Sequence, residues 1–159
     1  MTIKYDKQTK ENFKILKDLN WPTEHYRVFG GGIMSALGLK PWRDIDLIVS
    51  EEFFEVVREE YGGQYWYSTE THLPIHFNNL PIELGRFPVD LERNHPGLFN
   101  LNSFWNDYVM IEEVPFILMR HTHTYKLNRK NSKYVEVEEK DLQHIKLIED
   151  YLTISSFGY

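Results

Sequence analysis

The spacing of apolar residues predicts alternating helices and strands over the first sixty residues. Residues 8–20 place apolar side chains three or four positions apart, as on one face of an α-helix, and Trp21-Pro22 ends that pattern. The pattern then predicts, in chain order, a strand, a short helix, a strand and a helix, over 26–29, 32–39, 45–49 and 51–61.

Strand signals dominate the middle of the chain. A strand is predicted over 64–67, and the runs LPIHF and LPIEL flank Asn78-Asn79. This arrangement is typical of a β-hairpin, because Asn tolerates the positive φ of a tight turn. Residues 86–106 are predicted to form a loop with a short helix near Phe104.

Helix signals return towards the end of the chain. Pro115 suits the first position of a helix that runs to about Arg129. A last helix is predicted over 138–152, with a buried stripe formed by Leu142, Ile145, Ile148 and Leu152. The order of elements predicts an α+β fold, with helices packed mainly on one face of a mixed β-sheet.

Composition predicts one ordered domain over 1–159. Hydrophobic residues make up 42% and aromatic residues 15% of the chain, as in a globular protein with a core. Cysteine is absent, and the polar start MTIKYDKQTKENFK carries no signal-peptide pattern. No apolar run approaches the ~20 residues of a membrane span. We therefore expect a cytoplasmic protein.

The net charge of −6 bears on the kind of partner. Proteins that hold a long nucleic acid usually present a basic face, so this charge argues against an extended nucleic acid and against templated polymerisation. A small molecule or a protein is the expected partner.

The most specific chemistry lies in the segment 28–50, VFGGGIMSALGLKPWRDIDLIVS. A helix that opens after a glycine turn presents backbone N–H groups to an anion such as phosphate. Asp44 and Asp46 are two positions apart, so in a strand they share a face, with Ile45 on the other. Adjacent carboxylates repel, and a hard divalent cation such as Mg²⁺ relieves that repulsion.

This segment resembles the nucleotidyltransferase superfamily, whose members share the catalytic domain of DNA polymerase β. The family pattern is a strand, a glycine turn, a short helix and then Asp-x-Asp on the next strand. The resemblance implies a catalytic core over about 26–85, C-terminal helices over about 115–152, and two Mg²⁺ ions, or Mn²⁺, held by Asp44 and Asp46. The implied phosphate seat consists of Gly30, Gly31 and Gly32.

The chain departs from the family at Gly31, where many members carry Ser. The missing hydroxyl removes one phosphate contact, which backbone N–H groups could replace. Arg43, beside the Asp pair, either contacts a phosphate or balances the local negative charge.

The family also requires a third acidic residue on a neighbouring strand. Glu83 in LPIEL is the best candidate, because Ile82 and Leu84 flank it and face the core. Asp90 and Glu92 are weaker candidates, in a segment interrupted by proline. The plainer interpretation makes Glu83 an ordinary solvent-facing residue.

The C-terminal part resembles small bacterial nucleotidyltransferases of the lincosamide-resistance type and members of toxin–antitoxin pairs. These often carry a Lys late in one helix and a Lys-Asp pair that opens the last helix, as Lys126 and Lys140-Asp141 do here. The usual Arg two positions before that Lys is replaced by Glu138. The basic residues Lys126, Arg129, Lys130 and Lys133 either steer a triphosphate or form a solvated loop.

The histidines and the aromatic residues of the 64–67 strand are more simply explained by packing than by binding. His121 and His123 are two positions apart in a predicted helix and so do not share a face, which argues against a zinc site there. Neither His72 nor His76 supplies a helical His-x-x-x-His pair. The aromatic residues of the 64–67 strand could stack on a base but are more often core: Tyr65, Trp66 and Tyr67.

The expected function is therefore Mg²⁺-dependent transfer of a nucleoside monophosphate from an NTP to an acceptor hydroxyl on a small molecule or a protein. The catalytic and metal residues are Asp44, Asp46 and Glu83, and the nucleotide is bound by the three glycines, Arg43 and Lys126. A homodimer or a partner chain could complete the acceptor site. The alternative is a catalytically inactive relative that binds a nucleotide or a partner protein, as in a toxin–antitoxin pair.

Overall fold

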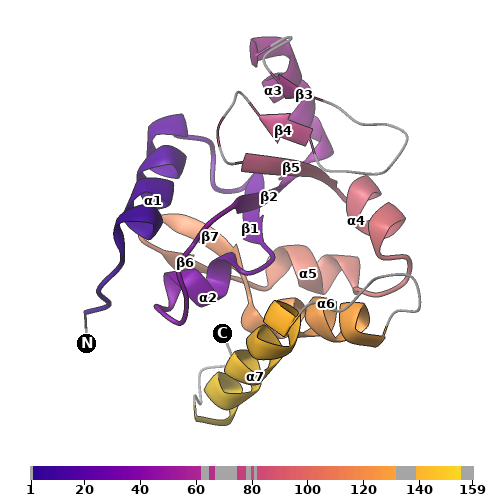
Figure 1. The fold of residues 1–159 in the computed structure, drawn as a ribbon. Coiled ribbons are helices and arrows are strands. Elements are labelled where there is room, and N and C mark those ends of the chain that lie inside the picture. The colour runs from indigo at the N-terminus through magenta and orange to yellow at the C-terminus, as the bar shows by residue number, and fades with distance from the viewer. Residues whose placement is uncertain are drawn as a thin grey trace.

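A mixed β-sheet runs through the molecule (Figure 1). The computed structural model describes residues 2–61, 65–66, 75–77, 80, 82–131 and 139–154. Within these residues the sheet has seven strands in the order β3-β4-β5-β2-β1-β7-β6. The strands are β1 (Tyr26–Phe29), β2 (Ile45–Ser50), β3 (Tyr65–Trp66), β4 (Ile75–Phe77), β5 (Ile82–Phe87), β6 (Tyr108–Ile111) and β7 (Val114–Ile117).

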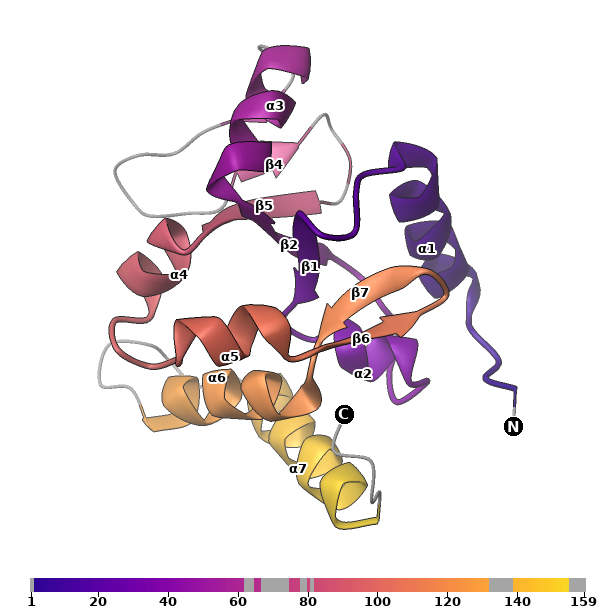
Figure 2. The ribbon, with the colours of Figure 1, turned by 180° about the vertical axis from the view of Figure 1, so that it is seen from behind.

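The helices of the described residues surround this sheet (Figures 1 and 2). They are α1 (Lys7–Leu19), α2 (Gly32–Ala36), α3 (Glu51–Tyr61), α4 (Val89–Asn94), α5 (Leu101–Asn106), α6 (Met119–Asn131) and α7 (Glu139–Ile154). The α+β class and the mixed sheet are confirmed. The described part of the chain contains no helix with the length and apolar character needed to cross a membrane.

The central strands determine which side chains meet. Strand β2 pairs antiparallel with β1, where Phe29 lies opposite Asp46, and parallel with β5, where Asp46 lies opposite Glu83. The glycine turn that follows β1 therefore begins beside Asp46. Strands β4 and β5 pair antiparallel, which confirms the predicted hairpin partners; Asn78 and Asn79 lie outside the described residues.

The side chains of β2 alternate between two hydrophobic clusters. Ile45, Leu47 and Val49 belong to the larger cluster, which contains residues of α1, α2 and α3. Ile48 belongs to a smaller cluster with Leu91 of α4 and residues of α5. Asp46 shares the face of Ile48, because side chains two apart in a strand point the same way. Asp46 therefore lies on the side of the sheet that packs against the smaller cluster.

A hairpin replaces the predicted start of the helix at Pro115. Pro115 lies in β7, opposite Met110 of β6, and helix α6 begins only at Met119. The two strands are joined by Glu112 and Glu113, with φ values of 52° and 65°. Two consecutive left-handed residues reverse the chain in the sense that suits a twisted hairpin. The prediction of a helix from Pro115 is wrong because glutamates are not the usual signal for such a turn.

Two other predictions need correction. Residues 86–106 are not mostly loop, because β5 extends to Phe87 and α4 occupies Val89–Asn94. In α7, Ile145 and Ile148 are buried as predicted, but Leu142 is 46% exposed and does not belong to the buried stripe.

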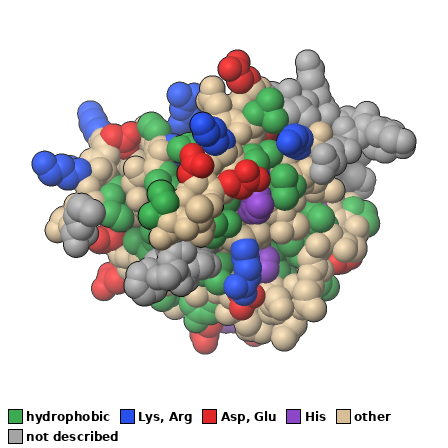
Figure 3. Space-filling model, turned by 90° about the horizontal axis from the view of Figure 1, so that it is seen from below, with side chains coloured by type: hydrophobic (Ala, Val, Ile, Leu, Met, Phe, Trp, Pro, Cys, Tyr) green, Lys and Arg blue, Asp and Glu red, His purple; other side chains and the backbone are tan. Residues whose placement is uncertain are grey.

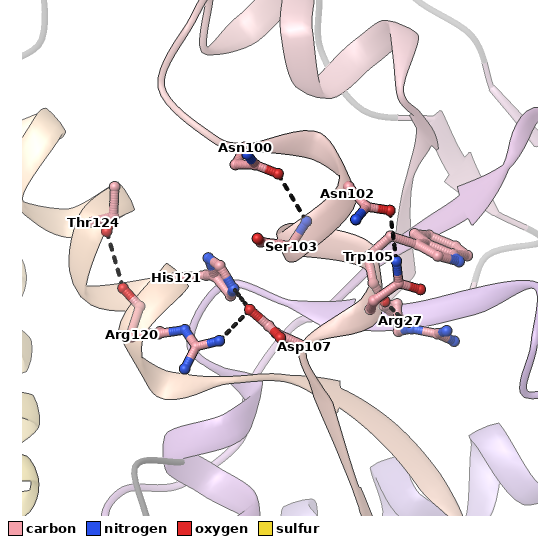
Figure 4. A network of polar contacts seen from close by, with 10 residues as sticks. Arg27, Asn100, Asn102, Ser103, Trp105, Asp107, Arg120, His121 and Thr124 are labelled. Atoms are coloured by element: carbon pink, nitrogen blue, oxygen red, sulfur yellow. Dashed lines mark hydrogen bonds and ion pairs between the residues drawn. The ribbon is translucent and has the colours of Figure 1, made fainter.

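A polar network fixes the start of α6 against α5 (Figure 4). Asp107, directly after α5, pairs with Arg120, and its carboxylate lies 3.4 Å from Nε2 of His121. The ring of His121 also packs against Phe104 of α5, with centroids 5.5 Å apart. These contacts give α6 a defined position relative to the sheet.

Candidate active site

A cleft of about 410 Å³ lies where the glycine turn, β2 and β5 meet helices α4, α6 and α7. Its polar lining combines acidic and basic side chains from elements that are far apart in the sequence. Figure 3 shows basic, acidic and histidine side chains gathered near the middle of the face seen from below. The lining residues with charged or polar side chains are Asp46, Glu83, Asp90, Asn94, His95, Tyr125, Lys126, Arg129, Lys140 and Asp141.

Two carboxyl groups form the acidic part of the cleft. Asp46 and Glu83 lie opposite each other on adjacent parallel strands and are hydrogen-bonded through their side chains. Burial, that hydrogen bond and the negative charges of Glu83 and Asp44 raise the pKa of Asp46 to about 8, against the opposing effect of Lys126. The Asp46 carboxyl group is therefore mostly protonated at neutral pH.

Asp44 takes a different position from its predicted partners. It is exposed, precedes β2, and does not line the cleft, although its charge acts on Asp46. Its backbone carbonyl oxygen accepts a hydrogen bond of 3.1 Å from the indole of Trp42. Among the described residues, no group of three or more His, Asp or Glu side chains is arranged to hold a metal ion. The structure therefore brings together two of the three predicted ligands.

The three glycines have separate roles. Gly30 has φ of +68°, and a Cβ there would lie 2.8 Å from Oδ2 of Asp46, so both backbone and space require glycine. The buried hydroxyl of Thr122 donates a 2.7 Å hydrogen bond to the Gly30 carbonyl and ties the turn to α6. Gly30 and Gly31 line the cleft.

Gly32 does not line the cleft. It is buried, and a Cβ there would lie 2.4 Å from Cγ1 of Val28. Gly32 therefore allows α2 to pack closely against β1, and a larger residue would disturb the core directly. Gly32→Val would therefore disturb the packing of the fold itself and not only a phosphate seat.

Two helices supply the basic part of the cleft. Nζ of Lys126 on α6 lies 2.8 Å from Oδ1 of the fully buried Asp141 on α7, and Nε of Arg129 lies 3.4 Å from the other carboxylate oxygen. Burial alone would raise the pKa of Asp141, but the hydrogen bond to Lys126 and the charges of Lys126 and Arg129 lower it below its usual value. This ion pair holds Lys126 at the cleft, and Lys140, next to Asp141 in the chain, also lines it.

The remaining predicted basic residues lie elsewhere. Arg43 is exposed and does not line the cleft. Lys130 is exposed near the end of α6 and does not line the cleft either. Lys133 and Glu138 lie outside the described residues, as do the side chains of the aromatic residues predicted for 64–67.

Helix α4 adds a wall that the sequence did not predict. Asn94 and His95 line the cleft, and the His95 ring meets Tyr125 edge-on, with centroids 5.1 Å apart. Asp90 is bound to Arg86 by two side-chain hydrogen bonds of 2.9 Å, so it is not available as a third metal ligand. If 89–94 is recognised as a helix, the spacing of Asp90 and Asn94, one helical turn apart, predicts that both side chains lie on one face of it.

The comparisons with known proteins bear on the fold alone. No protein-family model and no curated protein sequence matches the chain. Among solved structures, the fold is similar to that of an antigenic nucleotidyltransferase-like protein from Paracoccidioides brasiliensis, with a TM-score of 0.53 and 16% sequence identity. The alignment covers 91% of this chain and 76% of the other. The chain thus has a nucleotidyltransferase-like fold.

Replacing Asp46 by Asn should change how stability depends on pH. Because the pKa of Asp46 is raised from 3.8 to about 8 on folding, the folded state binds the extra proton between these values and loses stability as pH rises through them. Asn cannot ionise, so in metal-free buffer Asp46→Asn should melt close to wild type at pH 4.5 and higher at pH 8. Because one pKa unit corresponds to about 1.4 kcal/mol, we expect a difference of several kcal/mol at pH 8, or roughly 5–15 °C.

Thermal melts of both proteins from pH 4.5 to 9 in EDTA measure this difference. Asp150→Asn, at an exposed position on α7, is the control and should not show it. A variant that melts below wild type at pH 8 would mean that the Asp46 carboxylate stabilises the fold.

Gly32→Ala should destabilise the protein by about 1–3 kcal/mol, because the added methyl group overlaps Val28 in a packed core. The matched control is Gly85→Ala on β5, where a Cβ meets no atom closer than 3.9 Å. Urea unfolding followed by circular dichroism compares the two. Equal stability of both variants would show that Gly32 is not a packing glycine.

Proposed function

We propose that this protein is a divalent-metal-dependent nucleotidyltransferase that uses a nucleoside triphosphate. The observation that carries the proposal is the Asp46–Glu83 pair, placed in register beside the Gly30–Gly31 turn and inside a cleft. The fold likeness to a nucleotidyltransferase-like protein supports it.

The donor groups of the cleft suit Mg²⁺ or Mn²⁺. Asp46 and Glu83 offer carboxylate oxygens that repel each other when both are ionised, and hard cations bind such oxygens. Asp44, close enough to raise the pKa of Asp46, is the third candidate ligand, and two ions are expected in this class of enzyme. Bound metal would offset the charge of the phosphates and of the attacking and departing oxygens.

The residues of the chain then have distinct roles in the reaction. The oxygen of the acceptor hydroxyl bonds to the α-phosphorus, the bond from that phosphorus to the pyrophosphate oxygen breaks, and pyrophosphate leaves. The carboxylate of Glu83 takes the hydroxyl proton. Lys126 and Lys140, held at the cleft by α6 and α7, attract the triphosphate.

The acceptor side of the cleft is the wall formed by α4 and α6. His95, Tyr125 and Phe29 provide ring surfaces there, and Asn94 provides an amide. Such a mixture of rings and a few polar groups suits a small molecule or an exposed protein side chain. A second copy of the chain or a partner protein could complete this side.

A second candidate function is a non-catalytic module that binds a nucleotide or a partner protein. The position of Asp44 outside the cleft lining favours it. Of the carboxyl groups that do line the cleft in the described residues, Asp90 is bound by Arg86 and Asp141 by Lys126, which leaves the Asp46–Glu83 pair for a metal. The module would keep the phosphate-binding groups without needing the metal.

A thermal-shift experiment with each of the four NTPs, with and without Mg²⁺, separates the two candidates. A ligand that binds only the folded state at 100 times its Kd stabilises it by about 2.7 kcal/mol. For the enzyme, we expect this stabilisation to require Mg²⁺ and to be lost in Asp46→Asn and in Glu83→Gln, because each removes one negative charge from the metal position.

The control is Asp150→Asn, which should respond to Mg²⁺ and NTP as wild type does. Release of pyrophosphate from the stabilising NTP, tested with a panel of hydroxyl-bearing acceptors, then measures transfer. If Asp46→Asn and wild type gain equal stability from the same NTP, the carboxyl pair does not bind the metal and the binding module replaces the enzyme.

A further inference from the structure

Lys40 lies directly over the glycine turn, although it belongs to the segment between α2 and β2. A Cβ built on Gly31 would lie 2.9 Å from Cε of Lys40 and 3.1 Å from its Nζ. The end of the Lys40 side chain thus occupies the space that any side chain at position 31 would take. Lys40 itself does not line the cleft, but Gly31, against which its side chain lies, does.

The surroundings of Lys40 are rich in positive charge. Burial and the nearby charges of Lys126, Arg43 and Lys140 lower the pKa of Lys40, and only Asp46 acts in the opposite direction. Within the described part of the chain, Nζ donates to the carbonyl oxygen of Pro41 at 3.3 Å and has no ion pair. Lys126, by contrast, is already paired with Asp141.

A histidine on α7 shows the same local excess of positive charge. Burial and the charges of Lys126, Lys40 and Lys140 lower the pKa of His144 to about 4, so the imidazole is neutral at pH 7. Its Nδ1 atom is buried without a hydrogen-bond partner among the described residues. The ammonium groups of Lys40, Lys126 and Lys140 therefore all act on His144, in a protein whose overall charge is negative.

Packing alone does not explain why Lys40 is held near other cations without an ion pair among the described residues. A bound anion would explain it. Lysine at an exposed loop position normally turns its charge to water, since burial of an unpaired charge is costly. Here the side chain is instead half-buried against the turn that borders the carboxyl pair. A polyphosphate placed over the turn would bring negative charge to all three ammonium groups at once.

We propose that Lys40 binds the terminal phosphates of the triphosphate over Gly31, and that position 31 is glycine because a side chain there would displace Lys40. The proposal rests on the proposed function and names a residue outside the family pattern that the segment 28–50 matches. Glycine at position 31 thus leaves room for Lys40, and the ammonium group of Lys40 makes the phosphate contact that a Ser hydroxyl makes in many members of that family.

Calorimetric titration of the full chain with inorganic tripolyphosphate, without metal, tests the role of Lys40. We expect Lys40→Met to weaken binding by about tenfold or more, as for loss of a charge-assisted hydrogen bond, and Lys40→Arg to retain most of the affinity. The control is Lys146→Met, which removes the same charge from an exposed position on α7 and should change affinity less than about twofold. Circular dichroism checks that each variant is folded.

A double-mutant cycle tests the link between Lys40 and Gly31. Gly31→Ala should weaken tripolyphosphate binding in the wild type, because the methyl group displaces Lys40. In the Lys40→Met background the same substitution should have no further effect, since the group it displaces is gone. If the two substitutions weaken binding independently, so that their effects multiply in the double mutant, the assignment is overturned. Unchanged binding in Lys40→Met, or no binding by the wild type, would overturn it as well.

The outcomes also separate this proposal from the proposed function. Loss of tripolyphosphate binding in Lys40→Met, in a protein that transfers no nucleotide, supports the phosphate site and removes the enzyme. Metal-dependent nucleotide transfer by the wild type, with equal MgATP affinity in Lys40→Met, supports the enzyme and overturns the role of Lys40.

Discussion

Two carboxyl groups held side by side in the sheet determine how the rest of the site is built. Because β2 and β5 pair in register at Asp46 and Glu83, the two side chains leave the sheet from neighbouring positions. In the metal-free protein, burial first, and then the hydrogen bond and the negative charge of Glu83, raise the pKa of Asp46 to about 8, so Asp46 keeps its proton at neutral pH. A divalent cation in place of that proton would make the same geometry a metal site.

The neighbouring elements complement this negative centre. Gly30 is confined to glycine by the close approach of Asp46, and Thr122 fastens the turn to α6. The buried carboxylate of Asp141 forms an ion pair with Lys126, which places Lys126 at the cleft and balances the negative charge of Asp141. The cleft thus separates an acidic edge on the sheet from a basic edge on the helices, an arrangement that suits a metal beside a polyphosphate.

The sequence allowed prediction of the parts that depend on local pattern. Alternation around Ile45 and around Glu83 predicted two strands with the acidic residues on one face, and the structure places Asp46 opposite Glu83. The hairpin at Glu112-Glu113 was missed, because glutamates with positive φ carry no turn signal and Pro115 suggested a helix start. The contacts of Lys40 and Asn94 depend on long-range packing, which no local pattern contains.

Proton release during Mg²⁺ binding tests the central claim most directly. Calorimetric titration with MgCl₂ at pH 7, repeated in buffers of different ionisation enthalpy, counts the protons that leave the protein as the metal binds. If Mg²⁺ replaces the proton on Asp46, about one proton should be released per binding event at pH 7, and none in Asp46→Asn. Mg²⁺ binding without proton release, or no Mg²⁺ binding by the wild type, would contradict the account.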